Sequence, residues 1–228
     1  MAGGGKRRNV QTMPIPSKEH LLNIIKAHTN LSLAHKAFIS FLYLTGARVG
    51  EICANRPDLK KDLVIVRKTG WAVYREYISG HDWRGITIGQ LSFKEIEFKS
   101  TGQKKFVCLI ENVPTEKRRG EATIFRHLPI DVEKDKEFIE IFDQYLDAIK
   151  QYPTQPLFPF YRHEAFMIIK QFDPTWFPHF LRHIRLTHLA VDRDYTDIEL
   201  KQITGWADTR PAEKYVHLRW HDIVRKHF

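Results

Sequence analysis

Cysteine is scarce in this sequence, with only Cys53 and Cys108 among 228 residues. Small secreted domains that rely on disulfides contain cysteine at a much higher density. Both cysteines also lie in segments with apolar periodicity. We therefore expect two free, buried thiols in a reducing, intracellular compartment rather than a disulfide scaffold.

Long hydrophobic runs are also missing. No apolar stretch approaches the roughly 20 residues that a membrane-spanning helix needs. The first residues, MAGGGKRRNVQT, lack the apolar centre of a signal peptide, and we interpret residues 1–16 as a flexible leader. The sequence shows no internal repeat and no low-complexity tract. A membrane partner is therefore not expected.

Acidic residues are outnumbered by basic ones. The chain has 36 Lys and Arg against 27 Asp and Glu, a formal net charge of +9 and a sequence pI of about 9.5. This balance favours a polyanionic partner such as nucleic acid. Hydrophobic residues make up 43% of the chain, which is enough for a substantial core and argues against disorder.

Helical patterns dominate the chain. Ser17 precedes an amphipathic run and suits a helix N-cap. Residues 31–44 are apolar nearly all round, which predicts a buried helix, and Gly46 suits its C-terminal end. Further helices are expected at residues 47–55, 132–152, 163–172, 178–192, 196–204 and 211–228.

Strand-like runs are confined to the middle of the chain. Two runs within residues 63–78 flank Lys68-Thr69-Gly70, which predicts a hairpin. A second zone contains runs at 86–98, 104–113 and 122–130, separated by turn-like linkers. The expected fold is therefore mainly α with a small antiparallel β-sheet (α+β), in one domain over residues 17–228.

The segment HFLRH, residues 179–183, concentrates possible functional side chains. On a helix, His179, Arg182 and His183 project from one face because they lie three and four positions apart. A metal site would use the two histidines, but Phe180 stands where the zincin motif has a glutamate, and the arginine would repel the cation. A basic solvated face is the simpler alternative. A clamp for phosphate oxygens fits best, since arginine offers a planar fork of donors.

Three motifs, taken in order, resemble the catalytic domain of the tyrosine recombinase (phage integrase) superfamily. They are TGARVGEI, HFLRH, and Gly-Trp followed nine residues after the tryptophan by tyrosine. The match spans residues 45–217, and its order and spacing are more specific than any single motif. The resemblance implies a tyrosine recombinase catalytic domain-like fold. It also implies catalytic roles for Arg48, His179, Arg182, Trp206 and the nucleophile Tyr215, supported by Glu51 and His183.

These residue types suit attack on a phosphodiester. Negative charge builds on the non-bridging oxygens in the transition state, and each preorganised donor there is typically worth about 2.7 to 4 kcal/mol. Arg48 and Arg182 supply positive charge at any pH, and His179 can donate a hydrogen bond or relay a proton. Tyrosine has an ordinary pKa of about 10, so Tyr215 needs cationic surroundings to act as a nucleophile. This chemistry requires no metal and no other cofactor.

Each of these residues has a simpler interpretation when it is taken alone. Arg48 would suit an ion pair with Glu51, Trp206 a core residue at a helix end, and Tyr215 a packing aromatic. Their joint occurrence in the family order is what favours the catalytic interpretation.

The resemblance implies a lysine in a hairpin turn as proton donor to the leaving 5′-oxygen, and two lysines qualify. Lys117, in VPTEKRRGE, precedes a strand and then a helix, which is the order typical of the family. Lys68 lies nearer to Arg48 in the sequence, but no helix follows its second strand. We favour Lys117, which makes residues 60–84 a β-hairpin insertion.

The resemblance also implies a partner and an assembly. The expected partner is double-stranded DNA, bound by a homotetramer that exchanges strands at specific sites for a virus or mobile element. Most such enzymes carry a separate helical N-terminal domain, which we expect to be missing because only a short segment precedes Arg48. The expected location is the cytoplasm or the nucleoid. Phosphate contacts are expected from Arg118, Arg119, Arg126, Arg185, Arg193 and Arg210.

Three other functions remain open. A type IB topoisomerase-like enzyme would use the same chemistry to relax DNA. A non-catalytic DNA-binding module would bind through its basic residues and form no covalent adduct. A histidine-rich metallohydrolase would depend on a metal at HFLRH, and its activity would be sensitive to chelators.

Overall fold

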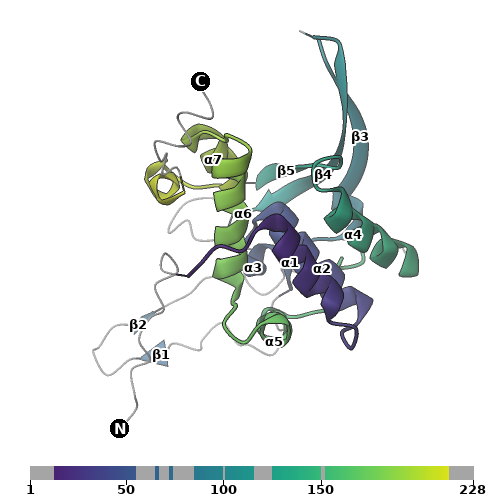
Figure 1. The fold of residues 1–228 in the computed structure, drawn as a ribbon, viewed down its shortest axis with the longest axis vertical. Helices are drawn as coiled ribbons and strands as arrows, with labels where there is room; N and C mark the ends of the chain where they lie inside the picture. Colours follow the sequence, from purple (N-terminus) through teal and green to yellow (C-terminus); the bar gives the residue numbers. More distant parts are fainter. Residues whose placement is uncertain are drawn as a thin grey trace.

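The computed structural model describes residues 13–54, 65–66, 72–73, 85–99, 101–115, 125–149 and 152–215. Within these ranges the chain combines packed helices with a small antiparallel sheet, which confirms the predicted α+β class. Figure 1 shows the helices gathered in the body of the molecule, with β3 and β4 projecting from it as a long hairpin.

The elements follow the predicted order closely. The α-helices are α1 (Lys18–Ala27), α2 (Leu33–Thr45), α3 (Val49–Ile52), α4 (Lys136–Ala148), α5 (Arg162–Phe172), α6 (Pro178–Asp192) and α7 (Asp197–Thr204). The strands are β1 (Ile65–Val66), β2 (Ala72–Val73), β3 (Leu91–Phe98), β4 (Gln103–Pro114) and β5 (Phe125–Asp131). Short 3-10 helices lie at η3 (Ile88–Gln90) and η4 (Arg210–Lys214). Of the helices in the described ranges, none is both long and apolar enough to cross a bilayer.

Helix ends follow the capping residues that the sequence offers. The Ser17 hydroxyl accepts a hydrogen bond from the His20 backbone N–H at 3.1 Å, which confirms the predicted start of α1. Gly46 and Gly205 follow α2 and α7 with φ of 56° and 68°. Glycine adopts this left-handed conformation without a Cβ penalty, so both helices end sharply and redirect the chain.

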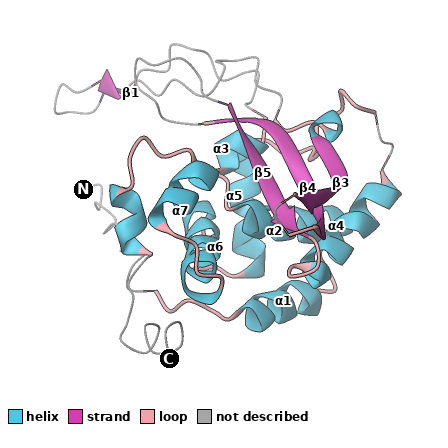
Figure 2. Cartoon of the chain, turned by 90° about the horizontal axis from the view of Figure 1, so that it is seen from above, coloured by secondary structure: helices cyan, strands magenta, loops and turns pink. Residues whose placement is uncertain are grey.

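Helix α2 is the centre of the core. All its residues from Ala37 to Thr45 are buried, as expected from its apolar sequence, and it contacts α1, α4, α6 and β5. Phe158 packs against the aromatic rings of Phe38, Phe41 and Tyr145 beside it. Figure 2 shows the sheet beside α2 and α4, and α7 contacts strand β5 of this sheet.

The main sheet has the strand order β3-β4-β5, and both pairings are antiparallel. Along β5 buried and exposed residues alternate, with Arg126, Leu128 and Ile130 on the buried face. A separate pairing joins β1 to β2, with Ile65 opposite Val73, and this confirms the hairpin predicted on either side of Lys68-Thr69-Gly70. The alternation in β5 directs an arginine into the protein interior.

A second, smaller hydrophobic cluster supports the C-terminal part of the described chain. It consists of Leu186, Leu189, Ala190, Leu200 and Ala212, and Tyr215 packs against it. The structure differs here from the predicted helix at 211–228. Residues 210–214 form a 3-10 helix with proline in its first turn, and Tyr215 follows as its C-cap. Positions 216–228 lie outside the described residues.

Candidate active site

Arg48 is fixed at the start of α3. Gly46 ends α2, and Arg48 is the N-cap residue of the next helix. The Glu51 carboxylate accepts hydrogen bonds from the Arg48 backbone N–H at 2.8 Å and from its Nη1 at 2.9 Å. Glu51 is completely buried, whereas the Arg48 side chain remains 13% exposed. Glu51 therefore holds Arg48 from the protein interior, and part of the Arg48 side chain is open to solvent.

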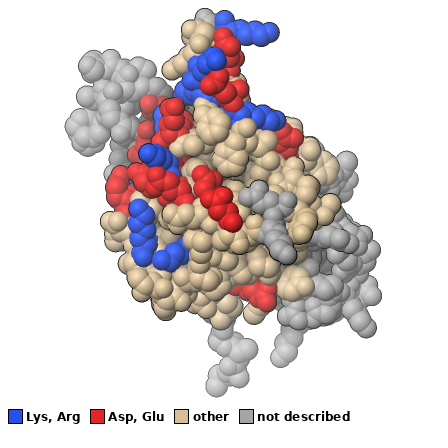
Figure 3. Space-filling view, turned by 90° about the vertical axis from the view of Figure 1, so that its right-hand side faces the viewer, with Lys and Arg blue, Asp and Glu red and all other residues tan. Residues whose placement is uncertain are grey.

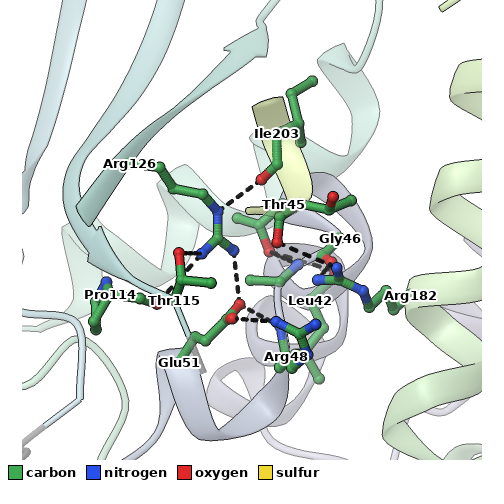
Figure 4. Close-up of polar contacts among 12 residues, drawn as sticks. Leu42, Thr45, Gly46, Arg48, Glu51, Pro114, Thr115, Arg126, Arg182 and Ile203 are labelled. Carbon is green, nitrogen blue, oxygen red and sulfur yellow. Dashed lines mark hydrogen bonds and ion pairs between the residues drawn. The ribbon is translucent and has the colours of Figure 1, made fainter. Parts of the chain in front are cut away.

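Arg126, on β5, binds the same carboxylate from another direction. Its Nη2 donates to Glu51 Oε2 at 2.7 Å, its Nη1 donates to Thr115 Oγ1 at 3.1 Å and to the Pro114 carbonyl at 3.3 Å, and its Nε donates to the Ile203 carbonyl at 2.7 Å (Figure 4). The residue is 5% exposed. Arg126 therefore makes its contacts inside the protein. The structure does not show it at the surface, where the phosphate contact expected from its charge would require it.

Arg182, on α6, reaches the same region from a third element. Its Nη1 donates to the Gly46 carbonyl at 2.6 Å and its Nη2 to the Thr204 carbonyl at 3.4 Å. Both acceptors lie at helix C-terminal ends, where the helix dipole favours positive charge. Arg48, Glu51, Arg126 and Arg182 together form what we term the arginine cluster (Figure 4).

The arginine cluster carries an excess of positive charge among the described residues. Burial alone would raise the pKa of Glu51, but the charges of Arg126, Arg182 and Arg48 outweigh it and lower this pKa to about 2. Burial lowers the pKa of Arg182 to about 10, with Glu51 acting in the opposite direction. Glu51 and Arg182 are therefore both ionised at neutral pH, and three guanidinium groups face one carboxylate. Such a site favours an additional anion.

Tyr215 lies beside this cluster. Its ring stacks on the Trp206 ring at a centroid distance of 5.8 Å and lies 5.0 Å from the His183 ring. The Arg182 guanidinium lies 5.8 Å from the centre of the Trp206 ring, which is within the range of cation–π attraction. Burial raises the pKa of Tyr215, while the charges of Arg182 and Arg48 lower it and offset part of that rise.

The structure thus brings together most of the residues expected from the sequence. Residues from α3, α6, the turn after α7 and the end of η4 meet in one place, namely Arg48, Glu51, Arg182, His183, Trp206 and Tyr215. His179 lies in the first turn of α6 and is exposed, unlike Arg182 and His183 one turn later. A charged ligand could reach His179 from solvent.

Other expected residues are placed differently. Arg185 is 3% exposed, and its Nη1 and Nη2 donate to Asp135 at 3.2 and 2.8 Å. Arg193 binds the same carboxylate. Arg185 is therefore a structural residue that joins α6 to the start of α4, and the DNA contact expected from its charge is corrected. Arg210 is exposed and pairs with Asp208 at 2.6 Å, so it remains accessible.

Four expected residues lie outside the described ranges, namely Lys68, Lys117, Arg118 and Arg119. The chain leaves the described part at Thr115 and re-enters it at Phe125. Thr115 contacts Arg126, so the segment that contains Lys117 starts at the arginine cluster.

Sequence reasoning missed the role of Arg126. Its charge suggested a surface contact, yet the alternation of Arg126 with Leu128 and Ile130 along β5 was a usable signal, since residues two apart share one face of a strand. No group of three His, Cys, Asp or Glu side chains suited to a metal ion is found in the described part of the chain.

No protein-family model and no curated protein matches the chain. Among solved structures, the XerH site-specific recombinase bound to its difH substrate superimposes with a TM-score of 0.51 at 13% identity, covering 93% of this chain and 53% of that one. XerA recombinase gives 0.49 at 18% identity, covering 94% and 65% of the two chains. The Tn1549 transposon integrase, in complex with transposon right end DNA, gives 0.47 at 14%, covering 94% and 66%.

The chain has a tyrosine recombinase-like fold. This finding confirms the resemblance as one of fold, and it rests on the superposition with XerH. The chain spans about half the length of the XerH protein, 53% of it. What a tyrosine recombinase-like fold does in this chain is decided by its own side chains, because one fold can carry unrelated functions.

Proposed function

We propose that this chain cleaves and rejoins double-stranded DNA, with Tyr215 as the nucleophile and a 3′-phosphotyrosine as the intermediate. The observation that carries the proposal is the convergence of Arg48, Arg182, His183 and Trp206 on Tyr215. These side chains come from separate parts of the chain, so local sequence does not explain their meeting. Two buried or half-buried arginines beside a phenol suit a phosphate diester.

The proposed cleavage step assigns a role to each group. The Tyr215 phenol oxygen attacks phosphorus, the bond from phosphorus to the 5′-oxygen breaks, and the phosphate stays on the 3′-oxygen, now bound to tyrosine. Arg48 and Arg182 stabilise the charge that develops on the non-bridging oxygens. His179 or His183 accepts the phenol proton or donates a hydrogen bond to the phosphate. Attack by a 5′-hydroxyl on the phosphotyrosine reverses the step and rejoins a strand.

The leaving 5′-oxygen needs a proton, and we propose Lys117 as its donor. Thr115, two residues before Lys117, binds Arg126 at the arginine cluster, which supports this choice over Lys68. The proposed DNA contacts outside the cluster are Arg118, Arg119 and Arg210. The exposed side of α4 carries Glu137, Glu140 and Asp147, and it lies opposite α7. Because these side chains are negatively charged and repel phosphate, this side of the protein does not suit DNA. Figure 3 shows acidic and basic side chains interspersed on that face.

A covalent-capture experiment tests the proposal. A pool of nicked duplex oligonucleotides with a randomised centre is incubated with the protein, and adducts that survive denaturing electrophoresis are isolated. We expect an adduct with the wild-type chain that persists in EDTA and is absent in Tyr215→Phe. Tyr195→Phe is the matched control, because Tyr195 is a half-buried tyrosine that packs on the same small cluster. Absence of any adduct, or an adduct retained by Tyr215→Phe, contradicts the proposal.

The full proposed activity is site-specific strand exchange by a homotetramer on DNA, serving a virus or mobile element. Two duplexes of different length that carry the selected site should give recombinant products in the presence of the protein. Relaxation of supercoiled plasmid without such products would instead identify a relaxing enzyme with the same cleavage chemistry.

A further inference from the structure

The outer part of the β3–β4 hairpin extends beyond the rest of the sheet. Strand β5 pairs with β4 between Val107 and Pro114, whereas β4 residues 103–106 pair with β3 residues 95–98. We term residues 95–98 and 103–106 the ribbon, and Figure 1 shows it pointing away from the helices. A two-stranded hairpin by itself is only marginally stable in water, so the ribbon would gain stability from a partner.

One face of the hairpin combines two exposed aromatic rings with charges of both signs. Directly opposed residues share a face and successive residues alternate, so this face contains Phe93, Glu95, Glu97, Lys104 and Phe106. The rings of Phe93 and Phe106 stack with their centroids 6.1 Å apart, yet these residues remain 39% and 45% exposed. Exposed aromatic rings gathered on a projecting arm are typical of a protein contact.

The two strands of the ribbon carry opposite charges on this face. Glu95 and Glu97 belong to β3, whereas Lys104 belongs to β4, and Figure 3 shows acidic and basic side chains on the projecting hairpin. Glu95 and Lys104 pair across the ribbon at 2.8 Å, with both side chains more than half exposed. Such an exposed pair contributes little stability, so both residues are available for other pairs. Because the two acids repel phosphate, this face suits a protein surface better than DNA.

A groove elsewhere on the chain has an apolar lining that such a face could cover. It has a volume of about 400 Å³ and lies between α4 and the helices α1 and α2. Its apolar lining consists of Leu31, Leu33 and Ile141, and the two leucines are only partly buried. The hairpin of the same copy projects away from these helices, so it does not cover the groove itself (Figure 1).

The charges that border the groove complement those of the ribbon. Lys26 of α1 and Lys36 of α2 line it from one side, and Glu137 and Glu140 of α4 line it from the other. The two glutamates pair with lysines of the same chain at the long distances of 3.4 and 3.9 Å, so these pairs are weak. The groove therefore offers lysines to the acidic strand of the ribbon and glutamates to its basic strand.

We propose that the ribbon of one copy docks in the α1–α2–α4 groove of a second copy of this chain. Phe93 and Phe106 cover the apolar lining, Glu95 and Glu97 pair with the groove lysines, and Lys104 pairs with the groove glutamates. Ribbon and groove are different surfaces, so each copy gives its ribbon to one neighbour and receives the ribbon of another. Head-to-tail contacts of this kind form closed rings or open filaments. The inference rests on the proposed function for the number of copies, four, but the contact itself does not depend on cleavage.

Phe106→Ala and Phe98→Ala are a matched pair of variants. Both phenylalanines are 45% exposed on the same hairpin, but Phe98 lies on the opposite face. Sedimentation velocity of the full chain without DNA, at low salt and up to about 0.5 mM protein, measures self-association, because a contact of this size is weak. We expect the wild type to associate, Phe106→Ala to associate at least about tenfold more weakly, and Phe98→Ala to stay within about threefold of wild type.

An exchange of charges tests whether the ribbon meets the groove. The ribbon variant carries Glu95→Lys and Glu97→Lys, and the groove variant carries Lys26→Glu and Lys36→Glu. Each variant alone should associate at least about tenfold more weakly than wild type, because like charges then face each other. An equal mixture of the two should recover wild-type association within about threefold, because each altered surface then meets its opposite. Thermal melting of each variant shows that it is folded before association is compared.

Several results would overturn the inference. They are a wild-type chain that stays monomeric throughout, equal effects of Phe106→Ala and Phe98→Ala, and a mixture of the charge variants that does not recover. Charge variants that associate like wild type but bind duplex DNA differently would mean that the ribbon contacts DNA instead, which also overturns it. The Tyr215 adduct is measured separately. Recovery in the mixture without any adduct supports the contact and refutes the proposed cleavage, and an adduct without self-association does the reverse.

Discussion

Replacement of Glu51 by glutamine tests the electrostatics of the arginine cluster through protein stability. The Glu51 carboxylate accepts charge-assisted hydrogen bonds from Arg48 and Arg126, and its pKa falls from 4.5 to about 2. One pKa unit corresponds to about 1.36 kcal/mol, so ionised Glu51 contributes about 3 kcal/mol to the free energy of unfolding. Because the folded-state pKa is the lower one, this contribution is present above pH 4.5 and is lost as the pH falls toward 2.

Urea unfolding of wild type and Glu51→Gln between pH 6 and 2.5 measures the effect. At pH 6 the variant should be less stable by about 3 to 5 kcal/mol, because buried arginines lose a charged partner. On acidification, the free energy of unfolding of the wild type should fall further than that of the variant. This additional loss should amount to most of the contribution of about 3 kcal/mol, so the two free energies should approach each other. Glu140→Gln, at an exposed position of α4, is the control and should follow wild type. Parallel loss of stability in wild type and Glu51→Gln would refute the reasoning.

Three further substitutions test the packing, each by urea unfolding at neutral pH. Asp135→Asn should cost about 3 to 5 kcal/mol, because it removes the buried charge that pairs with two arginines, and a cost below 1 kcal/mol would contradict that pairing. Tyr43→Phe should cost about 1 kcal/mol, since it removes the 2.9 Å hydrogen bond to the His188 ring, and no loss would mean that the bond contributes nothing. Phe158→Ala should cost about 3 to 5 kcal/mol at the centre of the aromatic cluster, and a much smaller loss would show that its neighbours collapse into the space.

Local signals made much of the fold predictable. Ser17 marked the start of α1, and the two glycines after α2 and α7 marked their ends, because each acts through its own backbone or a residue three positions away. The buried character of α2 followed from its uniformly apolar sequence. The candidate site followed from the order of motifs, which implied that distant residues meet, and the structure brings Arg48, Arg182 and Tyr215 together.

Long-range pairing of charges was not predictable in the same way. Arg185 and Asp135 are 50 residues apart, and Arg126 and Ile203 are 77 residues apart. No local pattern shows that an arginine will be buried opposite a particular acid or carbonyl, so the positive charge of Arg126 and Arg185 was assigned to the surface. Only the alternation of Arg126 with apolar residues along β5 indicated that Arg126 would be buried. The choice between Lys117 and Lys68 stays a prediction, since both lie outside the described residues.

Tyr215 rests on the small hydrophobic cluster around Leu186, Leu200 and Ala212 rather than on the main core around α2. Substitutions that shrink this cluster would therefore disturb the C-terminal part of the described chain while most of the protein keeps its packing. Such variants would be produced in normal amounts and resist proteolysis, yet behave as though the tyrosine itself had been changed. A genetic screen could yield inactive but abundant variants with substitutions at Leu200 or Ala212. Such variants should be interpreted as proteins in which Tyr215 is misplaced, and Leu200 and Ala212 should not be counted among the catalytic residues.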